Sequence, residues 1–154
     1  MRINSGVPRR TVLVGVALGA AAGCTDPGPP PPPDPLAALA DRARADAALA
    51  TAIASAVPSL AEGAGEVARV RGEHATALKA EVERERPPVS TTASAPPTTP
   101  PAAPKDEKAA LKALTDGLTA AQKEAAGLVP ALPRYRAGLV GSVTAACASL
   151  REVL

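Results

Sequence analysis

The fold is decided by residues 34–60, which read DPLAALADRARADAALATAIASAVPSL. Asp34 followed by Pro35 predicts a helix start, because aspartate caps free backbone N–H groups and proline is favoured at the first helical position. Apolar side chains then recur at three- and four-residue steps, the spacing of one helical face. They are Leu36, Leu39, Ala43, Ala47, Ala50, Ile53 and Val57.

A second helix is predicted after a break at Val57-Pro58, since proline ends a helix at the preceding residue. Ser59 and Glu62 have the spacing of a capping box, which predicts that this helix starts at Ser59. Its apolar face continues at the same helical spacing, through Leu60, Ala64, Val67, Val70, His74, Leu78 and Val82.

The C-terminal third repeats this plan. A third helix is predicted to start near Asp106 and to end at Gly127 as its C-terminal cap. Its apolar face is Leu111, Leu114, Leu118, Ala121 and Ala125. A break at Val129-Pro130 precedes a fourth helix, whose predicted apolar face is Leu132, Tyr135, Leu139, Val143, Ala146, Leu150 and Val153.

The two halves align at an offset of 72 residues, which indicates an internal repeat. The offset places Leu39 on Leu111, Val57-Pro58 on Val129-Pro130, Val67 on Leu139 and Leu78 on Leu150. Two amphipathic hairpins bury their apolar faces on each other, so the predicted fold is all-α, a four-helix bundle. The hairpins are expected at 35–86 and 105–154.

A Pro/Thr-rich linker at 87–104 is predicted to join the two hairpins. It contains seven prolines, which exclude a helix or a central strand. Its length permits either an up-down bundle or the long crossover of ferritin-like bundles.

Residues 1–23 are predicted to be an export signal. They contain three arginines and no acidic residue, followed by an apolar stretch at 11–22. That stretch is too short for a spanning helix, which needs roughly twenty residues. Residues 24–34 follow as a proline-rich stalk, for which a polyproline II conformation is expected.

The junction after this leader reads Ala21-Ala22-Gly23-Cys24. It resembles the lipobox of bacterial lipoproteins, and it departs from that pattern at Ala21, where leucine is usual. The resemblance implies that Cys24 is acylated with two or three chains, which hold a protein stably on a membrane. The alternative is an ordinary secretory signal cut nearby, with Cys24 left as a thiol.

Arg9-Arg10-Thr11-Val12-Leu13 resembles the twin-arginine export signal. The resemblance implies export of a folded protein, although paired arginines also precede the apolar stretch of Sec signals. The leader and the alanine-rich composition of the chain together resemble those of bacterial lipoproteins of actinomycete type. The resemblance implies lipid anchoring on the extracytoplasmic face of the cell membrane.

Composition and charge exclude several classes of partner. Removing the three leader arginines from the 17 basic residues leaves 14 against 15 acidic residues, a net charge of −1. A nearly neutral chain gives no electrostatic reason to expect nucleic acid. A single tyrosine, with no Phe or Trp, provides no aromatic platform for bases or sugars.

The residues that could carry chemistry are few. A ferritin-like di-iron site needs two Glu-x-x-His motifs, but the single histidine, His74, is preceded at that spacing by Arg71. His74 has two functional interpretations, a metal ligand or a pH-sensitive group, against a partly buried structural histidine bonded to a carbonyl or water. Cys147 is expected to be buried and inert; the alternatives are an intermolecular disulfide or, if Cys24 is not acylated, a Cys24–Cys147 bridge. Tyr135 is expected to pack its ring in the bundle with its hydroxyl outward.

No catalytic residue, metal site or cofactor is predicted. The expected function is therefore that of a membrane-anchored envelope lipoprotein whose bundle serves as a non-catalytic interaction or structural module. A protein partner or self-association is expected besides the membrane. The alternative is a ferritin-like exported bundle that carries a metal or an apolar ligand.

Overall fold

The computed structural model describes residues 32–87 and 102–154. Within these ranges the chain forms four α-helices and two short 3-10 helices, and no strand. The helices are α1 (Pro35–Ala56), η1 (Pro58–Leu60), α2 (Ala61–Glu85), α3 (Glu107–Leu128), η2 (Val129–Ala131) and α4 (Arg134–Glu152). The prediction of an all-α bundle of two helical hairpins is confirmed.

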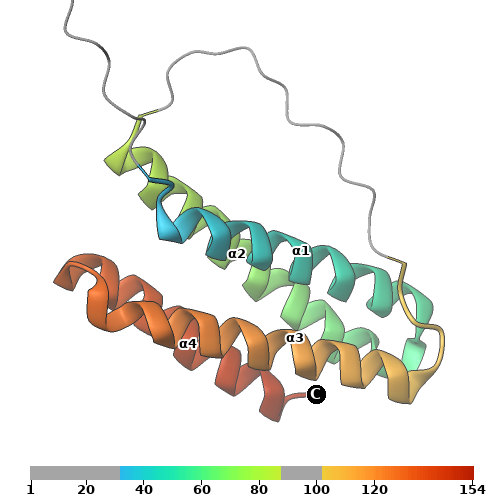
Figure 1. Ribbon diagram of the computed structural model, residues 1–154. Helices are drawn as coiled ribbons and strands as arrows, with labels where there is room; N and C mark the ends of the chain where they lie inside the picture. The colour runs from blue at the N-terminus through green and yellow to red at the C-terminus, as the bar shows by residue number, and fades with distance from the viewer. Residues whose placement is uncertain (1–31, 88–101) are drawn as a thin grey trace, which may run out of the picture. The chain divides into compact units, whose positions relative to one another are not determined.

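The helices pack as two antiparallel hairpins laid against each other. In Figure 1, α1 and α2 form one pair and α3 and α4 the other. Between the pairs, α1 lies against α3 and α2 lies against α4, while α1 contacts α3 more extensively than α2 contacts α4. Every helix therefore has two neighbours, as a four-helix bundle requires.

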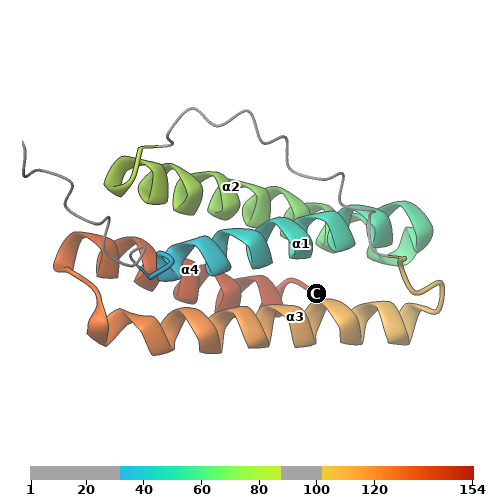
Figure 2. The same cartoon turned by 45° about the horizontal axis from the view of Figure 1, so that its top comes forward.

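Side-chain contacts fix the direction of each helix. The Ser59 hydroxyl, just before α2, donates to Glu107 Oε2 at the start of α3. At the other end, Asp34 at the start of α1 and Glu85 at the end of α2 both contact the first turn of α4. The end of α2 and the start of α3 thus lie at opposite ends of the bundle (Figure 2). Of the two connections that the sequence permits, the chain uses the one that spans the bundle.

The first helices of the two hairpins have matching boundaries. When α1 is shifted by 72 residues its first and last positions fall on those of α3. The N-caps coincide as well, since Asp34 accepts the Leu36 N–H at 2.9 Å and Asp106 accepts the Ala109 N–H at 2.8 Å. Each first helix also ends in a proline-containing 3-10 turn. These coincidences support the predicted internal repeat.

Two predicted helix ends are wrong. Ser59 lies inside η1, and α2 begins at Ala61 without a side-chain cap. The Ser59 hydroxyl donates to Glu107 of α3 and does not cap α2. Gly127 is not a C-terminal cap, because α3 continues to Leu128 and Gly127 has no positive φ. The 3-10 turn at Val129 ends this helix without the left-handed residue that a glycine cap supplies.

The core matches the predicted apolar faces in α1 and α3, and it departs from them at Arg71 in α2 and along α4. The buried residues of α4 are Arg136, Val140, Val143, Cys147 and Leu150. Tyr135 and Val153, placed on the predicted face, are 56% and 58% exposed. The buried face is thus rotated relative to the prediction, because an arginine takes a core position that a sequence pattern assigns to solvent.

Candidate functional site

Four polar residues from three helices meet inside the bundle and form what we call the Arg71 cluster: Asp46, Arg71, His74 and Cys147. Arg71 has 1% of its surface exposed and Cys147 has none. Arg71 lies on the inward face of α2 because it follows Ala64 and Val67 at helical spacing. Asp46 comes from α1 and Cys147 from α4, so the cluster joins the two hairpins.

The guanidinium of Arg71 has a partner for each nitrogen. Its Nη2 and Nε donate to Asp46 Oδ2 at 2.8 and 3.2 Å. Its Nη1 lies 3.1 Å from His74 Nδ1 and 3.5 Å from the Cys147 sulfur. A buried charge is tolerated only when it is paired and hydrogen-bonded, and Arg71 meets both conditions.

The cluster shifts the ionisation of its members. Burial, helped by the positive charge of Arg71, lowers the pKa of His74 to about 4. Burial raises the pKa of the Cys147 thiol, which the charge of Arg71 reduces only in part. Burial also raises the pKa of Asp46, and the pairing with Arg71 opposes that rise. At neutral pH the cluster therefore holds a neutral imidazole and a protonated thiol, a weak nucleophile.

A second buried arginine organises one end of the bundle, in what we call the Arg136 cluster: Asp34, Glu81 and Arg136. Arg136 Nη2 donates to both carboxylate oxygens of Asp34 at 2.7 Å. Its Nε lies 3.3 Å from Glu81 Oε1, close enough for an ion pair but without hydrogen-bond geometry. Arg136 in α4 thus takes both carboxylates from the first hairpin.

Asp34 has two tasks at this end of the bundle, capping α1 and pairing with Arg136. Burial alone would raise the pKa of its carboxyl. The Leu36 N–H and the Arg136 guanidinium outweigh burial, so the pKa of Asp34 lies below its ordinary value. The carboxylate therefore remains charged at neutral pH.

Tyr135 lies beside the Arg136 cluster on the bundle surface. Its hydroxyl donates to Glu85 Oε1 at 2.7 Å, and the Arg84 guanidinium stands 4.9 Å from the centre of its ring. The prediction that this ring packs inside the bundle is wrong. The ring instead makes a surface contact between α4 and the end of α2, of the cation–π kind.

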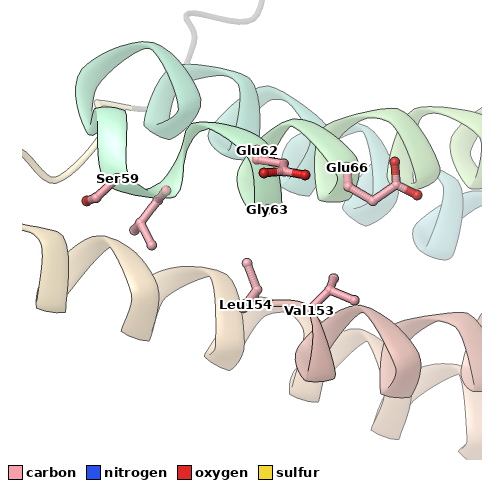
Figure 3. Close-up of a pocket in the computed structure, with 7 residues that line it drawn as sticks. Ser59, Glu62, Gly63, Glu66, Val153 and Leu154 are labelled. Carbon is pink, nitrogen blue, oxygen red and sulfur yellow. The ribbon is translucent and has the colours of Figure 1, made fainter.

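An open pocket lies between the start of α2 and the end of the described chain (Figure 3). Its volume is about 510 Å³, and its walls include Glu62, Glu66, Val153 and Leu154. A Cβ added at Gly63 would lie 3.2 Å from the Val153 carbonyl oxygen, so glycine permits a close approach here. Glu66 is paired with Arg69, and the pocket brings no set of convergent reactive groups together.

A second, much smaller void lies beside Asp46, lined by Val67, Gly117 and neighbouring apolar residues. Its volume is about 10 Å³, which is about the space that one water molecule needs. No apolar ligand fits in this void.

In residues 32–87 and 102–154 no group of three or more His, Cys, Asp or Glu residues is placed to hold a metal ion.

In the same ranges no helix is both long and apolar enough to span a membrane.

The sequence-predicted site residues Cys24, Arg9 and Arg10 lie outside the described residues. Cys147 is buried, as predicted, and is a free cysteine. His74 is partly buried, as expected of a structural histidine, and its Nδ1 lies against the Arg71 guanidinium rather than a backbone carbonyl. Sequence reasoning missed both buried arginines, and the signal that could have found them is their helical spacing from core residues.

No known protein family, curated protein or solved structure matches the chain.

Proposed function

We propose that this protein is an exported lipoprotein, anchored to the outer face of the cell membrane through acylated Cys24. The observation that carries the proposal is the run Ala21-Ala22-Gly23-Cys24 directly after an arginine-bearing apolar leader. Small residues before a cysteine fit a signal peptidase that prepares this cysteine for acylation. Two or more acyl chains give stable anchoring, whereas one gives marginal binding.

The four-helix bundle is then a non-catalytic interaction or structural module of the cell envelope. Two of its acids, the buried Asp34 and the partly buried Asp46, are engaged in ion pairs with Arg136 and Arg71 respectively. The Cys147 thiol is buried with a raised pKa. Groups held in this way are poorly suited to proton transfer or nucleophilic attack at neutral pH.

Anchoring is tested by changing Cys24→Ser in the full chain and separating membrane from soluble fractions. The acyl acceptor is then lost, so at least tenfold less protein should remain with the membrane. Thr25→Ser is the matched control and should remain with the membrane fraction. Unchanged membrane retention of the Cys24→Ser protein would contradict the proposal.

The export route is tested with Arg9→Lys and Arg10→Lys together. We propose the twin-arginine route, for which this double change should stop export, whereas a Sec signal accepts lysine in its basic region. Arg2→Lys is the control at a basic residue outside the pair. Normal export of the double variant would assign the chain to Sec.

The partner of the module is a second protein or a second copy of the chain. Crosslinking on intact cells, followed by purification under denaturing conditions, distinguishes them by the mass of the adduct. An adduct of twice the chain mass indicates self-association, and any other mass a different protein. Absence of an adduct with several crosslinker lengths would count against an interaction role.

A ferritin-like bundle that carries a metal or an apolar ligand is the second candidate. The observation that favours it is the connection between opposite ends of the bundle, the arrangement of ferritin-like folds. Metal analysis and mass spectrometry of protein purified from the envelope test it. Stoichiometric iron or zinc, or a retained apolar molecule, would replace the scaffold role by a carrier role.

A further inference from the structure

The contact between His74 and Arg71 has an unusual chemical requirement. A guanidinium carries only donors at any accessible pH, so His74 Nδ1, 3.1 Å from Arg71 Nη1, must accept. The imidazole is therefore neutral, with its proton on Nε2. A proton added at Nδ1 would point directly at another donor that is itself positively charged.

The charged groups around His74 leave it without a carboxylate partner. From α1, Asp46 is bonded to Arg71, while Arg42 and Glu124 of α3 pair with each other. On α2 itself, Glu73 binds Arg69 at 2.7 Å, and its negative charge only partly offsets the lowering of the His74 pKa. From α4, Cys147 and Arg151 face the cluster, and Arg151 donates to Thr119. In the described part of the chain no hydrogen bond or ion pair joins His74 to an acid.

We propose that His74 is an acid-sensitive switch that controls how tightly α2 packs against α4 over Cys147. When solvent supplies a proton to Nδ1, the imidazolium and the guanidinium become two cations and two donors facing each other. The partly exposed His74 ring then turns towards solvent. Arg71 Nη1 keeps one neighbour, the Cys147 sulfur at 3.5 Å, which is a weak acceptor.

The loss of that acceptor affects the packing between the hairpins. A buried cation with an unsatisfied donor must recruit water, and the packing between α2 and α4 is thinner than that between α1 and α3. Water is therefore admitted on the side of the bundle that covers Cys147. Since the pKa of His74 lies at about 4, opening develops as the pH falls from neutral towards 4. The switch belongs to the helical unit and does not depend on export or acylation.

Cys147 is the reporter for this opening. In the full chain with Cys24→Ser it is the one remaining thiol, since the sequence has two cysteines. Its rate of reaction with 4,4′-dithiodipyridine is measured in steps of half a pH unit from pH 7 to pH 3, a range that includes the pKa of His74 at about 4. Each rate is divided by the rate for the same protein unfolded in urea, which removes the direct effect of pH on the thiol.

We expect the normalised rate to rise at least tenfold between pH 7 and pH 4.5. His74→Gln should abolish the rise, because its amide oxygen accepts from Arg71 but does not titrate in this range. Thr76→Ala, an exposed change on the same helix, should retain it. The proposal is overturned if the normalised rate does not change with pH when His74 is present, or if it rises equally in the His74→Gln variant.

A second measurement needs no variant at position 74. His74 is the sole histidine, so its ring NMR signals titrate without overlap from another imidazole. The midpoint of this titration should coincide with the midpoint of Cys147 exposure. Midpoints that differ by more than about one pH unit would show that another group opens the bundle, and the switch would be rejected.

Discussion

The two hairpins have the same ground plan but satisfy their buried charges differently. Both begin with an aspartate N-cap and turn at a proline-containing 3-10 helix. In the first hairpin the buried Arg71 finds its carboxylate, Asp46, within the same hairpin. In the second, the buried Arg136 takes both of its carboxylates from the first hairpin. The buried arginine of the second hairpin therefore depends on the first hairpin for its counter-charge, whereas the buried arginine of the first hairpin does not depend on the second.

This difference shows how a repeated unit can acquire a fixed pairing. Two identical amphipathic hairpins can slide or rotate against each other at small cost, since apolar faces are not directional. An arginine whose acceptors lie on the partner hairpin penalises every other arrangement, because it would be buried without a counter-charge. The Arg136 cluster fixes the pairing at one end, and the contact from Ser59 to Glu107 does so at the other.

The largest effect on stability is expected when Arg71 loses its carboxylate partner in the first hairpin. Asp46→Ala leaves Arg71 buried without its counter-charge, and should lower the free energy of unfolding by about 3–5 kcal/mol. Urea unfolding followed by circular dichroism measures it. Asp41→Ala, which removes an exposed carboxylate of α1, should change stability by no more than about 0.5 kcal/mol.

The double change Asp46→Leu with Arg71→Met keeps this test informative if the single variant fails to fold. Replacing both partners of a buried pair by apolar side chains is often neutral or stabilising. The double variant should therefore be more stable than Asp46→Ala. A double variant as unstable as the single one would mean that packing, not the unpaired charge, causes the loss.

The next largest effect is expected at Asp34, and the equivalent N-cap of the second hairpin, Asp106, provides a matched control. Asp34→Ala removes a cap and the partner of Arg136, and should cost about 2–4 kcal/mol. Asp106→Ala, at the equivalent position, removes a cap alone and should cost about 1 kcal/mol. An equal loss of unfolding free energy in the two variants, measured by urea unfolding, would contradict the dependence of Arg136 on the first hairpin.

The charge of Asp34 gives a smaller effect that depends on pH. Its pKa is lowered in the folded chain, so its contribution to stability is complete above the ordinary value of 3.8. That contribution is lost as the pH falls through the lower folded pKa. Asp34→Asn retains a good cap without titrating. Its stability, measured from pH 6 to pH 2.5, should fall less steeply than that of the unchanged chain.

The smallest effect is expected at the surface contact between the hairpins. Tyr135→Phe removes the hydroxyl that donates to Glu85 but keeps the ring beside Arg84. Since the side chain is half exposed, the loss should be about 0.5 kcal/mol or less. A loss above about 2 kcal/mol would show that this contact, rather than Arg136, holds α4 to the first hairpin.

Much of the fold follows from local patterns. The Asp34-Pro35 start, the breaks at Val57 and Val129 and the apolar spacing of α1 are short-range features, and each is found as predicted. The repeat follows from the same patterns, because its boundaries are set by caps and prolines. The helix count and the pairing into hairpins could therefore be derived without the structure.

The polar clusters could not be derived in this way. Arg71 and Arg136 have the appearance of solvated charges in a sequence, since arginine is seldom fully buried unless it is paired. Their acceptors lie 25 and 102 residues away, beyond the reach of helical spacing. The same limit explains the rotated face of α4, where Tyr135 continues the apolar pattern in the sequence but is exposed in the structure. The prediction that Ser59 caps α2 is wrong for the same reason, because its hydroxyl donates to Glu107 in the other hairpin.

The helix ends at Glu85 and Glu107 set a minimum length for the connection between the two hairpins. This connection, residues 86–106, joins opposite ends of the bundle and must cover about the length of a 22-residue helix, about 33 Å. Fully extended it would reach about 70 Å. Deleting about twelve of its residues would leave a reach of about 30 Å, too short for the two hairpins of one molecule to meet. Such a shortened chain would recover its core by exchanging hairpins with a second molecule, and would become a swapped dimer whose formation depends on concentration.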